Sequence, residues 1–227
     1  MLLSLFVYFA KDVAHLIRDS IYGLFFLLRR KPTKEIVEIV PYSRWAFGII
    51  VASVPTGLIG FLFRDWFESL FGSLGAVGVA LLGTSFILWR TRKFQSGEKR
   101  IEKARVLDFL TIGLLQGVAI IPGISRSGST IAAGLFVGLD REVAFRFSFL
   151  LAIPAILGAA LLEMRKGLAL AEGEWLAVGV GFLVAALSGF FSILLVSKVM
   201  RRGKLHWFAA YTLPVGLLTL FLSRWLE

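Results

Sequence analysis

The sequence predicts an all-α polytopic membrane protein, made of transmembrane helices together with a re-entrant helical hairpin. Of the 227 residues, 57% are hydrophobic and 18% are charged, whereas a soluble domain carries roughly a quarter charged residues. The apolar residues form long uncharged runs, which excludes a soluble globular domain. The sequence contains no cysteine, so disulfides, thiolate chemistry and cysteine-ligated metals are excluded.

The apolar runs predict five transmembrane spans. A helix needs about 20 apolar residues to cross roughly 30 Å of hydrocarbon. One run, Phe147–Leu162, is short but is completed by Ala144–Arg146. Tryptophans at run ends match the aromatic belts of membrane interfaces. The other four spans are expected at Trp45–Phe63, Gly72–Trp89, Trp175–Ser197 and Leu205–Ser223.

The positions of the basic residues predict the orientation of these spans. Lys and Arg number 25 against 15 Asp and Glu, giving a net charge of +10. Such an excess can indicate a nucleic-acid partner, but in a membrane protein it marks cytoplasmic loops. Alternate connections hold 20 of the 25 basic residues, in segments 11–44, 90–105, 140–146 and 198–204. We therefore expect these segments in the cytoplasm and no nucleic acid as a partner.

The beginning of the chain does not fit a complete span. Met1–Ala10 is apolar but reaches only about 15 Å as a helix, which is half a bilayer. Lys11–Leu28 mixes charged and apolar residues, as interfacial amphipathic helices do. The short first segment leads us to expect that Met1 is an internal or misassigned start, or that the chain is a fragment.

Residues 106–139 predict the re-entrant hairpin. The charge pattern requires this segment to enter and leave on the same side. Its two arms, of about 16 and 14 residues around Pro122-Gly123, would each reach only about 21–24 Å. A non-helical tip within the membrane must be surrounded by protein or by a water-filled cavity. The pairs Gly113/Gly117 and Gly134/Gly138 would let the arms pack closely against neighbours.

The tip of the hairpin, residues 122–130, predicts a phosphate site. It carries the Arg126 guanidinium, four hydroxyls and two glycines. An unpaired arginine in a membrane costs several kcal/mol, so an anion must meet it, either a protein carboxylate or a ligand. Gly123 allows close backbone approach, a helix restarting near Ser127 offers free N–H groups, and Arg126 grips phosphate bidentately. In the alternative interpretation the hydroxyls only satisfy a helix break and Arg126 pairs with an acidic side chain.

Several stretches carry a resemblance to a known family. The tip reads Pro122-Gly123-x-Ser125-Arg126-Ser127-x-x-Thr130, and it is flanked by related stretches at Ile112–Gln116, Gly138–Glu142 and Arg146–Gly158. Tyr8–Asp12 and Ser96–Arg100 extend the likeness over nearly the whole chain. The sequence resembles the bacitracin-resistance family of undecaprenyl-diphosphate phosphatases.

The resemblance implies a fold, an activity and a location. The family is built from two inverted repeats, each with a re-entrant hairpin. The chain would then be one membrane domain, 1–227, with an incomplete first repeat at 1–105 and the second repeat at 106–227. The implied reaction removes the terminal phosphate of undecaprenyl diphosphate at the outer side of the bacterial plasma (inner) membrane. It recycles the lipid carrier for peptidoglycan synthesis and confers bacitracin resistance. A homodimer is one expected assembly.

The resemblance also implies roles for the tip residues. Arg126 and Ser125 are the expected catalytic residues, and the expected substrate-binding residues are Pro122, Gly123, Ser127, Thr130 and Gln116. For Gln116, simple helix–helix bonding is an equal alternative. A divalent cation, Mg or Ca, is implied, but the family's acidic first motif, which should precede Tyr8, has no matching positions. His15, His206, Asp108 and Glu163 are better explained as interfacial or helix-end charges than as replacements for that motif.

Other functions fit the sequence less well. In the second membrane lipid phosphatase family, five residues separate the Ser-Arg pair from a histidine, and at that position this chain has Ala132. Neither a Gly-x-Ser-x-Gly elbow nor a Walker A loop occurs. A polyprenyl-phosphate carrier without catalysis stays open, because broken helices at mid-depth are also typical of transporters. A purely structural protein would leave Arg126 unexplained.

Overall fold

The computed structural model describes residues 1–29, 39–94, 97–164 and 175–226, and within them every regular element is helical. The N-terminal helices are α1 (Leu2–Tyr8) and α2 (Ala10–Leu28). They are followed by α4 (Tyr42–Leu62), α5 (Arg64–Leu70), α6 (Leu74–Arg90), α7 (Val106–Val118), α8 (Arg126–Phe136), α9 (Arg141–Met164), α10 (Trp175–Arg201) and α11 (Ala209–Leu226). Short 3₁₀ turns lie at η1 (Thr91–Lys93), η2 (Ile101–Lys103) and η3 (Leu205–Phe208).

The five predicted spans are confirmed. Within the described residues, five helices are long and apolar enough to cross a membrane: Tyr42–Leu62, Leu74–Lys93, Arg141–Met164, Trp175–Arg201 and Leu205–Leu226. Their buried share is low, and only 11% of the most apolar window of α10 is buried. Large exposed apolar faces of this kind are expected where lipid, rather than water, surrounds a helix.

The N-terminal segment forms two helices that meet at Phe9. α1 packs against α9 and α10, and the Ser4 hydroxyl donates a hydrogen bond to the carbonyl of Ala186 on α10 (2.7 Å). The helix predicted over 11–28 is confirmed as α2. On α2, the carboxylate residue Asp19 is buried at 1% exposure, whereas the apolar residues Ile17 and Leu24 are exposed. The apolar face of α2 therefore points outward, toward the surrounding medium.

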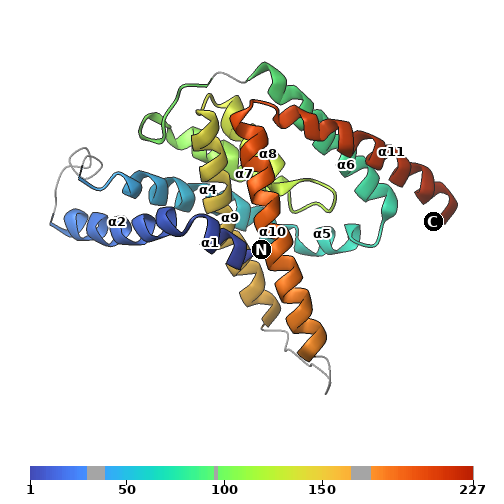
Figure 1. The fold of residues 1–227 in the computed structure, drawn as a ribbon, viewed down its shortest axis with the longest axis horizontal. Coiled ribbons are helices and arrows are strands. Elements are labelled where there is room, and N and C mark those ends of the chain that lie inside the picture. The colour runs from blue at the N-terminus through green and yellow to red at the C-terminus, as the bar shows by residue number, and fades with distance from the viewer. Residues whose placement is uncertain (30–38, 95–96, 165–174, 227) are drawn as a thin grey trace.

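The hairpin is present, with shorter arms than predicted. α7 and α8 pack against each other in the centre of the molecule, between the α2–α4 pair and the α6–α11 pair (Figure 1). The 13 residues of α7 and 11 residues of α8 span roughly 20 Å and 17 Å. Residues 119–125 form the turn that joins them.

Three of the four hairpin glycines make the predicted close contacts. A Cβ on Gly113 would lie 2.1 Å from the carbonyl oxygen of Ala52, and one on Gly117 would lie 2.6 Å from Ile59, so both face α4. Gly134 faces Ala144 on α9 in the same way. The prediction for Gly138 is wrong.

Gly138 ends α8 instead of packing against a neighbouring helix. Its φ is +86°, in the left-handed region that favours glycine. The N–H of Leu139 donates to the carbonyl of Gly134 (2.9 Å), which is the bond expected at a glycine-terminated helix end. Glycine is needed at this position because, having no Cβ, it adopts this left-handed conformation without strain.

One lysine ties the two ends of the hairpin together. Lys99 Nζ donates to Asp108 Oδ2 at the start of α7 (2.9 Å) and to the carbonyl of Val137 at the end of α8 (2.7 Å). The backbone of Lys99 pairs with Gly138 and Asp140 on either side of the bend. The 97–105 segment thus holds the base of the hairpin closed.

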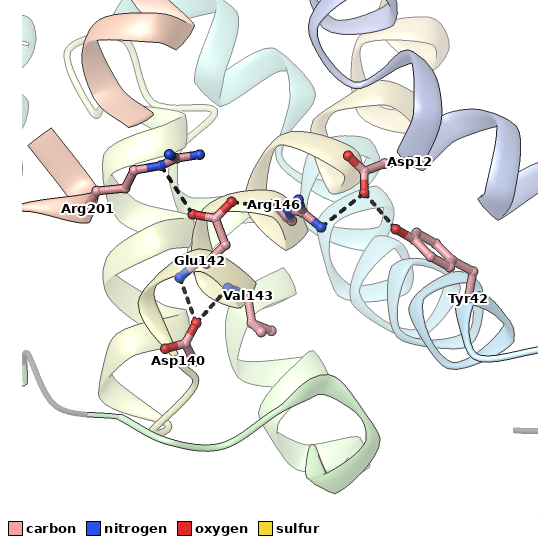
Figure 2. A network of polar contacts seen from close by, with 7 residues as sticks. All are labelled: Asp12, Tyr42, Asp140, Glu142, Val143, Arg146 and Arg201. Atoms are coloured by element: carbon pink, nitrogen blue, oxygen red, sulfur yellow. Dashed lines mark hydrogen bonds and ion pairs between the residues drawn. The ribbon is translucent and has the colours of Figure 1, made fainter. Parts of the chain in front are cut away.

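A polar network joins the same end of the molecule to other helices (Figure 2). Asp12 on α2 accepts hydrogen bonds from the Tyr42 hydroxyl (2.8 Å) and from Arg146 on α9 (3.4 Å). Arg146 also pairs with Glu142, whose other oxygen lies 3.8 Å from Arg201 on α10.

The N–H of Asp140, a residue of the Figure 2 network, donates to the carbonyl of Lys99. The network therefore connects the described parts of the four basic segments 11–44, 90–105, 140–146 and 198–204. Residues 30–38 of the first segment lie outside the described residues, as do 95–96 and 165–174. The arrangement agrees with the prediction that the four segments share one side of the membrane.

Candidate functional site

The turn at the hairpin tip is shaped by Gly123. Its φ is +96°, which L side chains rarely adopt. A Cβ at this position would lie 2.6 Å from the carbonyl oxygen of Val77 and 2.9 Å from Ala80, both on α6. The close approach that the structure shows for Gly123 is to α6, and its approach to a phosphate stays a prediction.

Helix α8 begins directly after the turn. Ser125 is the N-cap, and its hydroxyl accepts a hydrogen bond from the backbone N–H of Gly128 (3.1 Å). The helix starts at Arg126, one residue earlier than predicted. The N–H groups of Arg126 and Ser127 lie in the first turn, ahead of the first intrahelical bond, so they and the helix dipole favour an anion at this end.

A cavity of about 500 Å³ opens beside this helix start. Its polar lining comes from Arg126, Ser127, Thr130 and Ser148. The remaining lining is mainly apolar, from Met1, from the turn (Ala119–Ile124) and from Phe149, Ala152 and Ile156 on α9. A cavity of this size, with a few convergent polar groups in apolar walls, is typical of small-molecule sites.

Arg126 brings an uncompensated positive charge to the cavity. Within the described residues its guanidinium has no hydrogen bond or ion pair, and its side chain is exposed. The carboxylates Asp12, Asp19 and Asp108 pair with other cations. The alternative in which Arg126 pairs with an acidic side chain therefore has no support in the described part of the chain.

Thr130 and Ser148 form the buried floor of the cavity, at 1% and 2% exposure. The Thr130 hydroxyl donates to the carbonyl of Arg126 (2.8 Å) and contacts the Ser148 hydroxyl. Ser148 lies on α9, 18 residues from Thr130. Ser148 was not among the residues predicted for the site, although a serine between Phe147 and Phe149 in an apolar span is a polar signal.

Two predicted residues lie away from this cavity. Ser125 lines a second cavity of about 400 Å³, which α6, α10 and α11 bound on another side of the tip. Gln116 is 1% exposed, donates to Thr56 on α4 (3.4 Å), and its Oε1 has no partner within the described residues. For Gln116, the observed contact is the helix–helix bond that was the alternative.

The other candidates occupy structural positions. Asp108 accepts hydrogen bonds from Lys99 and from the backbone N–H of Arg105 (2.8 Å) at the start of α7. The ring centroids of His15 and Tyr42 are 5.2 Å apart, and His206 lines an apolar groove with Trp89 and Trp207. None of these side chains lines the Arg126 cavity.

Comparison with known proteins identifies the family. Residues 1–218 match the family of the bacitracin resistance protein BacA. The chain belongs to the BacA family. It is 44% identical over 195 residues to the undecaprenyl-diphosphatase of Carboxydothermus hydrogenoformans, an alignment covering 83% of this chain and 75% of that protein. The undecaprenyl-diphosphatase of Halothermothrix orenii is 42% identical over 193 residues, or 84% of this chain and 74% of that protein. The undecaprenyl-diphosphatase of Methanothermobacter thermautotrophicus is 46% identical over 178 residues, or 76% of this chain and 97% of that protein.

The divalent cation implied by the BacA resemblance does not fit the residues described. Hard cations such as Mg²⁺ and Ca²⁺ prefer carboxylate and carbonyl oxygens. The cavity lining offers a guanidinium and hydroxyls. In the part of the chain that the structure describes, no group of three or more histidine and acidic side chains is placed to hold a metal.

Proposed function

We propose that this BacA-family chain is an undecaprenyl-diphosphate phosphatase, which hydrolyses undecaprenyl diphosphate to undecaprenyl phosphate and phosphate. The observation that carries the proposal is the Arg126 guanidinium. It has no protein partner within the described residues, and it lines a cavity at the free N-terminus of α8. The same reaction is named for the relatives of the chain.

The tip residues have distinct roles in this proposal. Arg126 holds diphosphate oxygens through two parallel N–H donors. The first-turn N–H groups of α8 and the Ser127 hydroxyl add donors on the same side. Fixed donors of this kind stabilise the negative charge of a transferring phosphoryl group, which is the main requirement of this chemistry. Ser125 and Thr130 fix the start of α8, through the cap and through the bond to the Arg126 carbonyl.

The direction of the cavity suggests where the substrate enters. α9 begins at Arg141 in the basic end of the molecule, and the cavity follows it from Ser148 to Ile156. Fifteen residues of helix correspond to roughly 22 Å, so Ile156 lies far from the basic end. We propose that the chain resides in the plasma membrane with the basic end in the cytoplasm and the cavity facing the outer side. The prenyl tail would lie along the apolar faces of α9 and α10, and the exposed face of α10 is also where a homodimer would form.

Phosphate release by the purified chain tests the proposal. Undecaprenyl diphosphate should yield equimolar phosphate and undecaprenyl phosphate, and undecaprenyl phosphate itself should not be cleaved. The rival function is a polyprenyl-phosphate carrier without catalysis, which the unpaired Arg126 would also serve. Saturable binding of undecaprenyl diphosphate without phosphate release would support the carrier and contradict the phosphatase.

A further inference from the structure

The hairpin tip rests on one face of α6. Val77, Ala80, Thr84 and Leu88 recur at helical spacing along this face. Val77 and Ala80 meet Gly123, while Leu88 lies 3.1 Å from the position that a Cβ on Gly128 would take. Thr84 lies between these contacts and is 2% exposed. It is the polar residue on an otherwise apolar face.

The Thr84 hydroxyl acts as both a hydrogen-bond donor and an acceptor toward the turn. It donates a hydrogen bond to the carbonyl of Gly123 (2.9 Å) and accepts one from the N–H of Ser125 (3.0 Å). A threonine hydroxyl has a single proton to donate, so these two bonds occupy its donor and one acceptor site. One side chain from a different helix thus fixes the backbone on both sides of Ile124.

The start of α8 needs this outside contact. In a capping box, the side chain three residues after the N-cap accepts the N–H of the N-cap residue. In α8 that position is Gly128, which has no side chain, and a Cβ there would lie 2.8 Å from Ser125 Oγ. Thr84 accepts the Ser125 N–H in its place. It also turns the Gly123 carbonyl toward α6, where its negative end is paired within the protein.

We propose that Thr84 is a positioning residue for the anion site: its two hydrogen bonds fix the tip so that the N–H groups of Arg126 and Ser127 stay free for phosphate. This inference rests on the proposed function, which it deepens. Thr84 lines the second cavity, beside Ser125, and not the Arg126 cavity, so its effect on the Arg126 cavity passes through the backbone that it holds.

The test compares variants of the full chain in detergent, with two readouts. The first is kcat and KM for undecaprenyl diphosphate. The second is the rise in unfolding temperature caused by inorganic pyrophosphate. Thr84→Val keeps the side-chain shape and removes both hydrogen bonds, while Thr84→Ser keeps the hydroxyl. The matched control is Thr91→Val, because Thr91 is 1% exposed and its hydroxyl donates to the carbonyl of Leu88 in its own turn.

Thr84→Val should lower kcat by about tenfold to a hundredfold and abolish stabilisation by pyrophosphate. Thr84→Ser and Thr91→Val should stay within about threefold of the wild type. Retained kcat in Thr84→Val, or an equal loss in Thr84→Ser, would overturn the proposal. If Thr84→Val does not fold, Thr84→Ala carries the same comparison.

The second readout separates this inference from the proposed function. If the wild type releases no phosphate but pyrophosphate still stabilises it and Thr84→Ser, and not Thr84→Val, the phosphatase proposal fails and the role of Thr84 stands. If pyrophosphate stabilises Thr84→Val as much as the wild type, the role of Thr84 is refuted whatever the enzyme does.

Discussion

Arg126 carries the charge of the candidate site, and its neighbours determine how that charge is presented. Ser125 caps the helix that begins at Arg126, and Thr130 bonds back to the Arg126 carbonyl. The guanidinium itself is left free among the described residues. The hydroxyls of Ser125 and Thr130 therefore hold the backbone at the start of α8, and the Arg126 guanidinium lines the cavity without a described partner.

Two substitutions of Arg126 should separate the effect of its positive charge from the effect of its two parallel N–H donors. Arg126→Ala should lower kcat/KM for undecaprenyl diphosphate by about a thousandfold or more, because it removes a donor that stabilises transition-state charge. Arg126→Lys keeps a positive charge but loses bidentate pairing, so a loss of about tenfold to a hundredfold is expected. Steady-state kinetics in detergent measure both. Arg224→Ala, at the far end of α11, is the control and should match the wild type, whereas less than a tenfold loss in Arg126→Ala would contradict the role of Arg126.

Some residues of the candidate site could be predicted from the sequence alone, and others could not. The motif placed Pro122, Gly123, Arg126, Ser127 and Thr130 together because they are close in the chain. Thr84 and Ser148 are 41 and 18 residues away from their partners Ser125 and Thr130. Only tertiary packing brings them to the tip. A local pattern marks Ser148 as a polar residue in an apolar span, but it does not place Ser148 or Thr84 at the site.

Helix packing around the hairpin depends on glycines that allow backbones to approach. Gly113→Ala should destabilise the protein by about 1–3 kcal/mol, because the new methyl group meets the Ala52 backbone of α4 at 2.1 Å. Gly57→Ala on α4 is the matched control, since no atom lies within 4 Å of its Cβ position. That control should be neutral or slightly stabilising. Thermal unfolding in detergent compares the two, and equal unfolding temperatures would show that the α4–α7 contact is looser than described.

The closure of the hairpin base by Lys99 gives a second prediction at this scale. Lys99→Met removes the partner of Asp108 and of the Val137 carbonyl, so a loss of about 1–3 kcal/mol in unfolding free energy is expected. Arg64→Met breaks an exposed i,i+4 pair with Glu68, so it should leave the unfolding free energy almost unchanged. Chemical unfolding measures both, and a smaller effect for Lys99→Met than for Arg64→Met would refute the closure.

At the level of helices, the sequence predicted those elements whose positions depend on hydropathy and charge. The spans and the hairpin follow from long apolar runs and from where basic residues fall. The glycine pattern was ambiguous, because Gly134 and Gly138 share the same spacing as Gly113 and Gly117. One of them packs on Ala144 while the other ends the helix at φ +86°, and helix length alone separates the two uses.

The whole molecule places its described basic segments at one end and its cavity further along α9. The network of Asp12, Tyr42, Arg146, Glu142 and Arg201 binds α2, α4, α9 and α10 together there (Figure 2). The exposed apolar faces of the spanning helices surround the rest of the fold. This separation supports the proposed orientation, with the basic end in the cytoplasm.

Cysteine labelling checks that orientation, because the natural chain has no cysteine. Ser69→Cys, on exposed α5, should react with a membrane-impermeant maleimide in intact spheroplasts. Glu98→Cys, exposed in the basic end, should react only after the membrane is opened. The reverse pattern would place the basic end outside and overturn the orientation.

The central claim is that the hairpin tip binds the diphosphate of a polyprenyl lipid and cleaves it. A single-turnover measurement tests it most directly: purified chain in excess over undecaprenyl diphosphate, with the lipid product followed by mass spectrometry, beside Arg126→Ala. We expect conversion to undecaprenyl phosphate by the wild type and essentially none by Arg126→Ala. Equal conversion by the two proteins, or none by the wild type, would contradict it.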